Sequence, residues 1–176
     1  MSNLDRPSKE TSAQALGRFA TTVQRALGLR GEVNIHITSS REMQELNRRY
    51  RRKNKPTDVL SFPSGGPDAG GDIAISLEIA DANAAKIGHS LAAEVKILIL
   101  HGLLHLAGYD HEIDDGEMLA REAAMRAELK LPVGLIERTH AAGAKVAVVA
   151  RKPKAVPKKT AAARSATNHK RGGPGA

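Results

Sequence analysis

The most constraining feature of the sequence is the apolar segment from Ala92 to Ala107 (AAEVKILILHGLLHLA). A helix that is apolar on nearly every face has to be buried inside a protein. Its longest uncharged run, Ile97 to Ala107, is interrupted by histidine and is too short to span a bilayer. The segment therefore predicts a central buried helix, with Gly108 as its C-terminal stop.

The remaining chain predicts short helices and strands around this helix. Apolar spacing, alternation, capping residues and turn residues are the signals used. They predict helices over 13–27, 39–50, 78–87 and 114–130, and strands over 32–38, 58–62 and 72–76, the last two joined by the turn-rich SGGPDAGG. We therefore expect an α+β fold, a small mixed β-sheet packed against a buried central helix with surrounding helices.

Three histidines in and after the central segment form the pattern H-x-x-x-H-x-x-G-x-x-H, at His101, His105 and His111. Residues four apart lie on one face of a helix, and Gly108 allows the chain to turn back toward them. Three imidazoles suit Zn²⁺ and leave a fourth position for water, as in catalytic zinc sites. Any one of these histidines alone is better explained as a hydrogen-bonded core residue, but the joint spacing favours a metal site.

The same spacing is typical of the zinc-binding helix of metzincin proteases, with one difference. In H-E-x-x-H peptidases, a glutamate after the first histidine takes a proton from the zinc-bound water. This chain has Gly102 at that position. The pattern therefore predicts a metzincin-like zinc-binding helix and argues against peptidase chemistry.

Charge divides the chain into two parts. Residues 1–138 carry 18 basic and 19 acidic side chains, whereas residues 139–176 carry nine basic side chains and no acidic one. We expect one folded domain over 1–138 and a basic, disordered tail over 139–176, which is either a solubilising extension or an attachment to nucleic acid. The chain has no cysteine, and its N-terminus lacks the apolar core of a secretory signal, so we expect a cytoplasmic protein without membrane attachment.

A second local cluster of charge is RRYRRKNK, from Arg48 to Lys55, in which six of eight residues are basic. One explanation for these basic residues is purely structural, because positive side chains are favourable at the negative, C-terminal end of a helix. In an almost neutral domain they also form a positive patch that can contact phosphate. An arginine in such a patch could stabilise charge that develops on a phosphate, because a guanidinium matches two phosphate oxygens.

Four blocks of the sequence together resemble the YbeY-type endoribonucleases of bacteria, which are zinc-dependent and mature rRNA. The blocks are LNRRYRRKNKPTDVLSFP (46–63), GDIAISLE (71–78), HSLAAEVKILILHGLLHLAGYDH (89–111) and EMLAREAAM (117–125). The resemblance covers roughly Ile35 to Leu131, and the basic tail lies outside it.

This resemblance implies a single-strand-specific, metal-dependent ribonuclease that acts in 16S rRNA 3′-end maturation and ribosome quality control. It implies one zinc ion per chain with His101, His105 and His111 as ligands, and Arg51 as the important arginine near the metal. Its partners would be rRNA, ribosomal particles and ribosomal or assembly proteins. We expect further RNA contacts from five basic residues, namely Arg48, Arg49, Arg52, Lys53 and Lys55.

Several points stay open at the sequence level. Asp110 either accepts a hydrogen bond from a ligating imidazole and so orients it, or caps the turn after Gly108. With two Phe, two Tyr and no Trp, a broad base-stacking platform is not expected, so RNA would be held chiefly through its backbone. The alternative functions are a zinc peptidase or amidase, and a non-catalytic assembly factor with structural zinc. The nucleophile, the cleavage site, the native metal and the oligomeric state are not determined.

Overall fold

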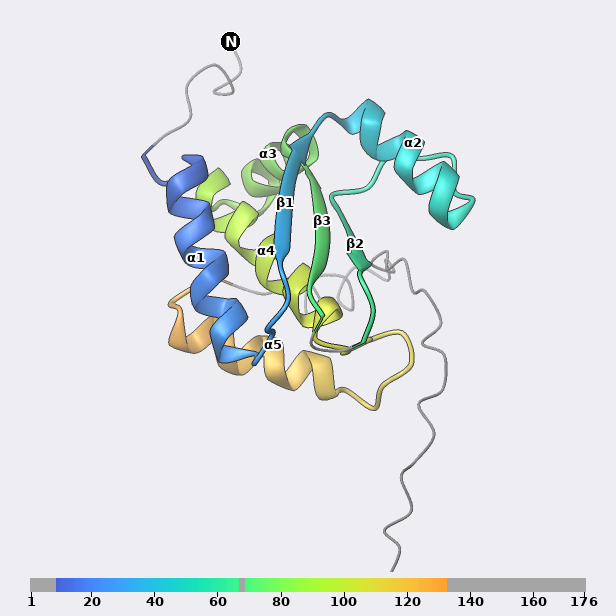
Figure 1. Cartoon of the computed structure of the whole chain (residues 1–176). Coiled ribbons are helices and arrows are strands. Elements are labelled where there is room, and N and C mark those ends of the chain that lie inside the picture. Colours follow the sequence, from blue (N-terminus) through green and yellow to red (C-terminus); the bar gives the residue numbers. More distant parts are fainter. Residues whose placement is uncertain (1–8, 67–68, 133–176) are drawn as a thin grey trace, which may run out of the picture.

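The computed structural model describes residues 9–66 and 69–132 (Figure 1). Within these ranges it contains five helices and three strands. They are α1 (Ala13–Ala26), β1 (Val33–Thr38), α2 (Ser40–Arg51), β2 (Val59–Pro63), β3 (Gly71–Ser76), α3 (Leu77–Ile87), α4 (Leu91–Leu106) and α5 (Glu117–Glu128). The α+β fold class predicted from the sequence is confirmed. The predicted tail over 139–176 and the end of the predicted domain lie outside the described residues.

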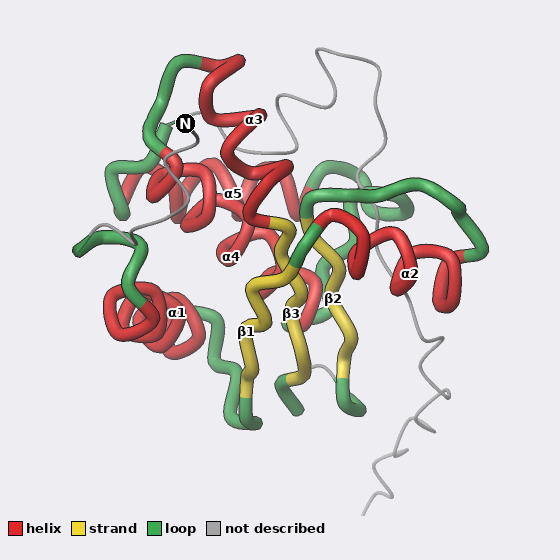
Figure 2. The backbone as a smooth tube through the Cα atoms, turned by 90° about the horizontal axis from the view of Figure 1, so that it is seen from above, coloured by secondary structure: helices red, strands yellow, loops and turns green. Residues whose placement is uncertain are grey.

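The three strands form one mixed sheet in the order β1-β3-β2. β1 pairs with β3 in parallel, with Ile35 opposite Ile73. β2 pairs with β3 antiparallel, with Ser61 opposite Ile73, so the turn-rich segment between them connects a hairpin. Figure 2 shows the three strands side by side, with α1 on the β1 side and α2 on the β2 side.

Helix α4 is the centre of the fold, as its apolar sequence predicts. From Ile97 to Leu106 every residue of this helix is buried. α4 packs against β2 and β3 and also contacts α1, α3 and α5. Burying a leucine or isoleucine side chain contributes about 1.5–3 kcal/mol, so the α4 side chains are a major part of the core.

On the opposite face of the sheet, α2 packs against parts of β2 and β3. Because strand residues alternate between faces, Val59 and Ile73 pack toward α4, whereas Leu60 and Ala74 form a second, smaller cluster with Met43 of α2. β2 therefore lies between the two helices that carry the candidate site residues.

Local capping residues fix several helix ends. Ser39 and Glu42 form a capping box at the start of α2, and Gly88 ends α3 in the left-handed conformation at φ 84°. The last helix starts later than predicted, at Glu117 rather than Asp114. Its start is displaced because the Asp114 carboxylate accepts hydrogen bonds from the N–H groups of Gly116 (2.9 Å) and Met118 (3.0 Å), which caps α5 from outside the helix.

Among the described helices, none alone is long and apolar enough to cross a membrane. Only α3 and α4 taken together meet that requirement, and the chain bends by 115° between them.

Candidate metal centre

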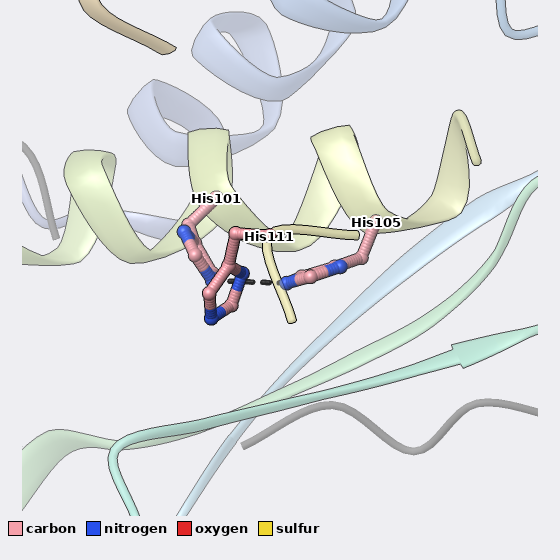
Figure 3. A group of neighbouring side chains, drawn as sticks. All are labelled: His101, His105 and His111. Carbon is pink, nitrogen blue, oxygen red and sulfur yellow. Dashed lines mark hydrogen bonds between the residues drawn. The ribbon is translucent and has the colours of Figure 1, made fainter. Parts of the chain in front are cut away.

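His101 and His105 lie one helical turn apart on α4, and His111 returns to them from the segment that follows the helix (Figure 3). The ring centroids of His101 and His105 are 4.7 Å apart, and each lies 5.2 Å from the centroid of His111. One candidate ligand atom from each residue lies within 4.8 Å of the other two. The structure therefore brings together the three histidines that the sequence pattern predicts as ligands.

The end of α4 turns the chain back so that His111 can reach this position. Gly108 adopts φ 93°, and the N–H groups of Gly108 and Tyr109 donate to the carbonyls of His105 (3.0 Å) and Leu104 (3.1 Å). These two bonds form the Schellman motif, which commonly ends helices at a glycine. After this turn the Tyr109 carbonyl faces the His105 ring.

The hydrogen bonds of the two α4 histidines define which nitrogen carries a proton. His105 Nδ1 lies 2.9 Å from the Tyr109 carbonyl oxygen, and a carbonyl oxygen can only accept, so Nδ1 is the protonated nitrogen. His101 Nδ1 lies 3.3 Å from Glu122 Oε2, and a carboxylate selects the same tautomer there. The unprotonated Nε2 atoms of His101 and His105 then face each other at 3.0 Å.

Two nitrogen lone pairs at this distance repel each other unless a cation lies between them. Ligand nitrogens of one tetrahedral zinc ion would be about 3.4 Å apart at ordinary Zn–N distances. Both ring nitrogens of His111 are buried and make no hydrogen bond within the described part of the chain. The three residues therefore fit a metal ion held by nitrogen donors, and an ion would satisfy atoms that the protein leaves unsatisfied.

The environment also keeps His105 neutral, as a metal ligand has to be. Burial holds the pKa of His105 well below its usual value of 6.5, and the charges of His101, His111 and Arg51 act in the same direction. The hydrogen bond to the Tyr109 carbonyl opposes this shift without reversing it. At neutral pH the His105 ring therefore offers a lone pair.

Glu122 of α5 is a candidate residue of this site that the sequence analysis missed. Its side chain is almost completely buried and its carboxylate lies against His101 at the 3.3 Å distance given above. A carboxylate in this position orients a ligating imidazole and makes it a stronger donor. A sequence signal existed, because Glu122 lies at the core-facing spacing of Met118 and Met125 on α5.

Asp110 follows Tyr109 in the segment after α4, and its hydrogen bonds belong to a turn. Its Oδ1 accepts a hydrogen bond from the Glu112 N–H at 3.1 Å, and its carbonyl accepts from Ile113 and Asp114. These contacts correspond to the turn-capping interpretation. A bond from Asp110 to an imidazole stays a prediction.

Arg51, the last residue of α2, lies close enough to His105 for its charge to lower the pKa of that histidine. Its side chain is 9% exposed, and its Nη2 lies 3.7 Å from Glu112 Oε1, too far for a hydrogen bond. Its Nη1 is buried without a hydrogen-bond partner in the described residues. Burial lowers the pKa of Arg51, while the carboxylates of Glu112 and Asp110 raise it. The guanidinium therefore has an unused donor near the candidate metal ligands.

The other predicted RNA contacts all lie on the surface at or after the C-terminus of α2. The exposed residues of this set are Arg48, Arg49, Arg52, Lys53 and Lys55. Arg52 adopts the left-handed conformation at φ 58° and ends α2, so the residues after it leave the helix direction. The structure thus places a basic surface next to Arg51.

Gly102 does not line the metal centre, although it follows His101. A Cβ at position 102 would lie 2.9 Å from two Ile73 carbons and 3.1 Å from Ser61 Oγ, so this position faces the sheet. The Gly102 carbonyl also accepts a hydrogen bond from Ser61 Oγ at 3.3 Å. A glutamate at 102 would have no space here, so this fold cannot place the peptidase base at that position.

Comparison with known proteins identifies the same family over the whole described domain. A family model described as Endoribonuclease YbeY matches residues 3–130. The Endoribonuclease YbeY of Koribacter versatilis is 57% identical over 128 residues, which cover 73% of this chain and 84% of that protein. The Endoribonuclease YbeY of Solibacter usitatus is 50% identical over 124 residues, covering 70% of this chain and 84% of that protein.

A solved structure agrees with the sequence matches. The solution structure of a Thermotoga maritima protein superimposes on this chain with a TM-score of 0.51 at 31% sequence identity. The match covers 66% of this chain and 83% of that protein.

Proposed function

Because this chain belongs to the endoribonuclease YbeY family and is therefore a metal-dependent hydrolase of RNA, we propose that its active site consists of a zinc ion held by His101, His105 and His111 and a phosphate held by Arg51. The family predicted from the sequence motifs is confirmed. The observation that carries the proposal is the 3.0 Å approach of two unprotonated Nε2 atoms beside a buried arginine with an unused donor.

The three histidines are the proposed zinc ligands, and their surroundings supply the tautomer that binding requires. A zinc ion on three imidazoles supplies a Lewis acid and lowers the pKa of water that it binds. The Tyr109 carbonyl and the Glu122 carboxylate hold the Nδ1 protons of His105 and His101, so that both Nε2 atoms point to the same place. The groups that fix these two tautomers therefore belong to the protein itself.

Arg51 is proposed to bind the phosphate at which the RNA strand is cut. Charge builds on the phosphate oxygens during cleavage, and a fixed cation there stabilises the transition state. The guanidinium offers two parallel N–H donors to two oxygens, and its nearest carboxylate is too distant to compete through a hydrogen bond. A phosphate would also satisfy the buried Nη1.

The attacking group is either water or the 2′-OH of the RNA. Gly102 cannot supply a carboxylate base, because its position faces the sheet. The product ends distinguish the two routes: a 2′,3′-cyclic phosphate indicates the 2′-OH, and a 5′-phosphate with a 3′-OH indicates water.

We further propose that the substrate is single-stranded rRNA, cut during maturation of the 16S 3′ end and in ribosome quality control in the cytoplasm. The exposed basic residues next to Arg51 would hold the strand through its phosphates. Binding of this kind weakens steeply with salt. Residues 1–138 would form the enzyme domain, and the basic residues 139–176 would add affinity for ribosomal particles without contributing to chemistry.

The decisive experiment measures RNA cleavage and bound metal together for the wild type, His105→Ala and Arg51→Ala. We expect His105→Ala to lose both zinc and cleavage, and Arg51→Ala to keep zinc but lose at least 100-fold in cleavage rate, as for removal of one transition-state donor. The matched controls are Arg18→Ala on α1 and Lys86→Ala on α3, which lie outside the basic surface next to Arg51. Both controls replace exposed residues and should keep zinc and activity.

Two outcomes would contradict the proposal. Wild-type zinc in His105→Ala would remove this residue from the ligand set. Casein cleavage that survives Arg51→Ala, in a protein without RNA cleavage, would instead support a peptidase or amidase.

A further inference from the structure

The C-terminal half of α2 borders a groove that the proposed active site does not use. The groove has a volume of about 1270 Å³ and lies between α2 and the sheet face opposite α4. Tyr50, Arg49 and Phe62 line it together, while the histidines of the metal centre do not. It therefore adjoins the metal centre only through α2 and β2.

Tyr50 is unusual among the aromatic residues because its surface is available. It is 48% exposed, and its ring meets the Phe62 ring edge-to-face, with centroids 5.1 Å apart at 70°. The Arg49 guanidinium carbon lies 5.5 Å from the Tyr50 centroid. Two of the four aromatic rings in the chain and one guanidinium thus gather at one surface position.

Arg48 and Arg49 bring local positive charge to the end of the groove that holds Tyr50. Three acids line the groove as well, and each has a polar contact. Asp72 lies 3.2 Å from His36, Glu45 lies 3.7 Å from Arg41, and Glu42 accepts hydrogen bonds from Thr38 and Ser39. Within the described residues neither Arg48 nor Arg49 forms an ion pair. The positive charge next to Tyr50 is therefore available to phosphate.

The sequence of α2 connects this position to the active site. Tyr50 and Arg51 are consecutive, and successive helical side chains point about 100° apart. Arg51 turns toward Glu112, whereas Tyr50 turns into the groove. Because the two side chains leave α2 at consecutive positions, a strand with one phosphate on Arg51 could place a neighbouring nucleotide at Tyr50.

We propose that Tyr50, supported by Phe62 and flanked by Arg49, is a stacking site for one unpaired nucleobase next to the phosphate bound by Arg51. An exposed aromatic ring is how proteins commonly hold an unstacked base, and guanidinium planes contribute to the same kind of site. This is one base position rather than the broad platform that the low aromatic content excludes. The inference rests on the proposed function, because it places the RNA strand at Arg51.

Tyrosine fluorescence tests the proposal directly, because the chain has no tryptophan and two tyrosines. In a Tyr109→Phe protein all intrinsic emission comes from Tyr50. We expect a 2′-O-methylated single strand to quench this emission, and the same strand with abasic positions to leave it almost unchanged. The integrity of the strand after each titration is checked on a gel.

Affinity provides the second measurement. Stacking by one base corresponds to roughly 5- to 100-fold in affinity, so Tyr50→Ala should lose this factor for the base-containing strand and nothing for the abasic strand. Tyr50→Phe should bind like the wild type. Tyr50→Leu keeps an apolar contact with Phe62 but has no aromatic face, and should behave like the alanine variant.

Different experimental results would refute this inference and the proposed function. If the wild type cuts RNA but binds abasic and base-containing strands equally, or if Tyr50→Ala binds both like the wild type, the stacking site is refuted. If base-dependent quenching at Tyr50 persists in a zinc-loaded protein that cuts no RNA, the proposed function fails and the stacking site stands.

Discussion

Gly102 of α4 and Ile73 of β3 are so close that a Cβ at position 102 would lie 2.9 Å from both Cδ1 and Cγ2 of Ile73. Real Cβ atoms are almost never found that close to another carbon, so the distance between α4 and the sheet depends on the glycine. His101 and His105 lie on another side of the same helix, facing His111. The glycine thus sets the position of the helix that carries two of the three candidate ligands.

Replacement of this glycine should destabilise the protein although alanine favours helices. Gly102→Ala gains about 1 kcal/mol in helix propensity but overpacks the core, which costs about 1–3 kcal/mol, so we expect a net loss of about 1 kcal/mol in the free energy of unfolding by urea. Gly17→Ala in α1 has open space at its Cβ and should instead gain up to about 1 kcal/mol. Equal stabilisation by both substitutions would show that Ile73 adapts freely.

Glu122→Gln should weaken metal binding without unfolding the protein. The amide keeps the shape of the side chain but loses the charge that faces His101 Nδ1, so we expect about a tenfold loss in zinc affinity, and up to about 100-fold for Glu122→Ala. Competition with a chelator measures both values, and the exposed Glu128→Gln on α5 is the control. Unchanged affinity in Glu122→Gln would mean that the carboxylate only fills space.

Acid should destabilise the metal-free protein through His105. Its folded-state pKa is depressed, so as pH falls through 6.5 the unfolded chain takes up a proton at this residue and the folded chain does not. Stability from His105 is therefore present above pH 6.5 and is lost below it, by up to about 1.4 kcal/mol per pH unit until the depressed pKa is reached. Urea unfolding of chelator-treated protein between pH 5 and 8 should show a shallower dependence for His105→Gln. Identical slopes would contradict this assignment.

The histidine cluster could be predicted from the sequence because its geometry is local. His101 and His105 are joined by one helical turn, and Gly108 marks the turn that returns His111. The capping box of Ser39 and Glu42 was predictable for the same reason. Short-range spacing determines these positions almost independently of the rest of the chain.

Contacts between distant segments could not be predicted in this way. Glu122 meets His101 across 21 residues because α5 packs on α4, and Arg51 meets Glu112 because α2 ends beside the segment after α4. Gly102 was interpreted as the loss of a catalytic base, but only its packing against Ile73 shows that no side chain fits there. Periodicity indicates which face of a helix is buried, but not which polar group lies opposite.

Asp58→Asn should stabilise the protein at neutral pH and lose that advantage in acid. Burial raises the pKa of Asp58, and the nearby Glu94 adds to the shift, although the hydrogen bond from the Val59 N–H opposes it. The folded state therefore binds this proton more tightly than the unfolded chain, whose pKa is near 3.8. The cost of the buried carboxylate is present in full above the raised pKa and disappears as pH falls toward 3.8.

We expect the free energy of unfolding of Asp58→Asn to rise by about 1 kcal/mol at pH 7, a size typical of one buried polar group. Urea unfolding measures this change, with Asp81→Asn as the control. A less stable Asp58→Asn at pH 7 would show that the hydrogen bonds to the carboxylate outweigh its burial.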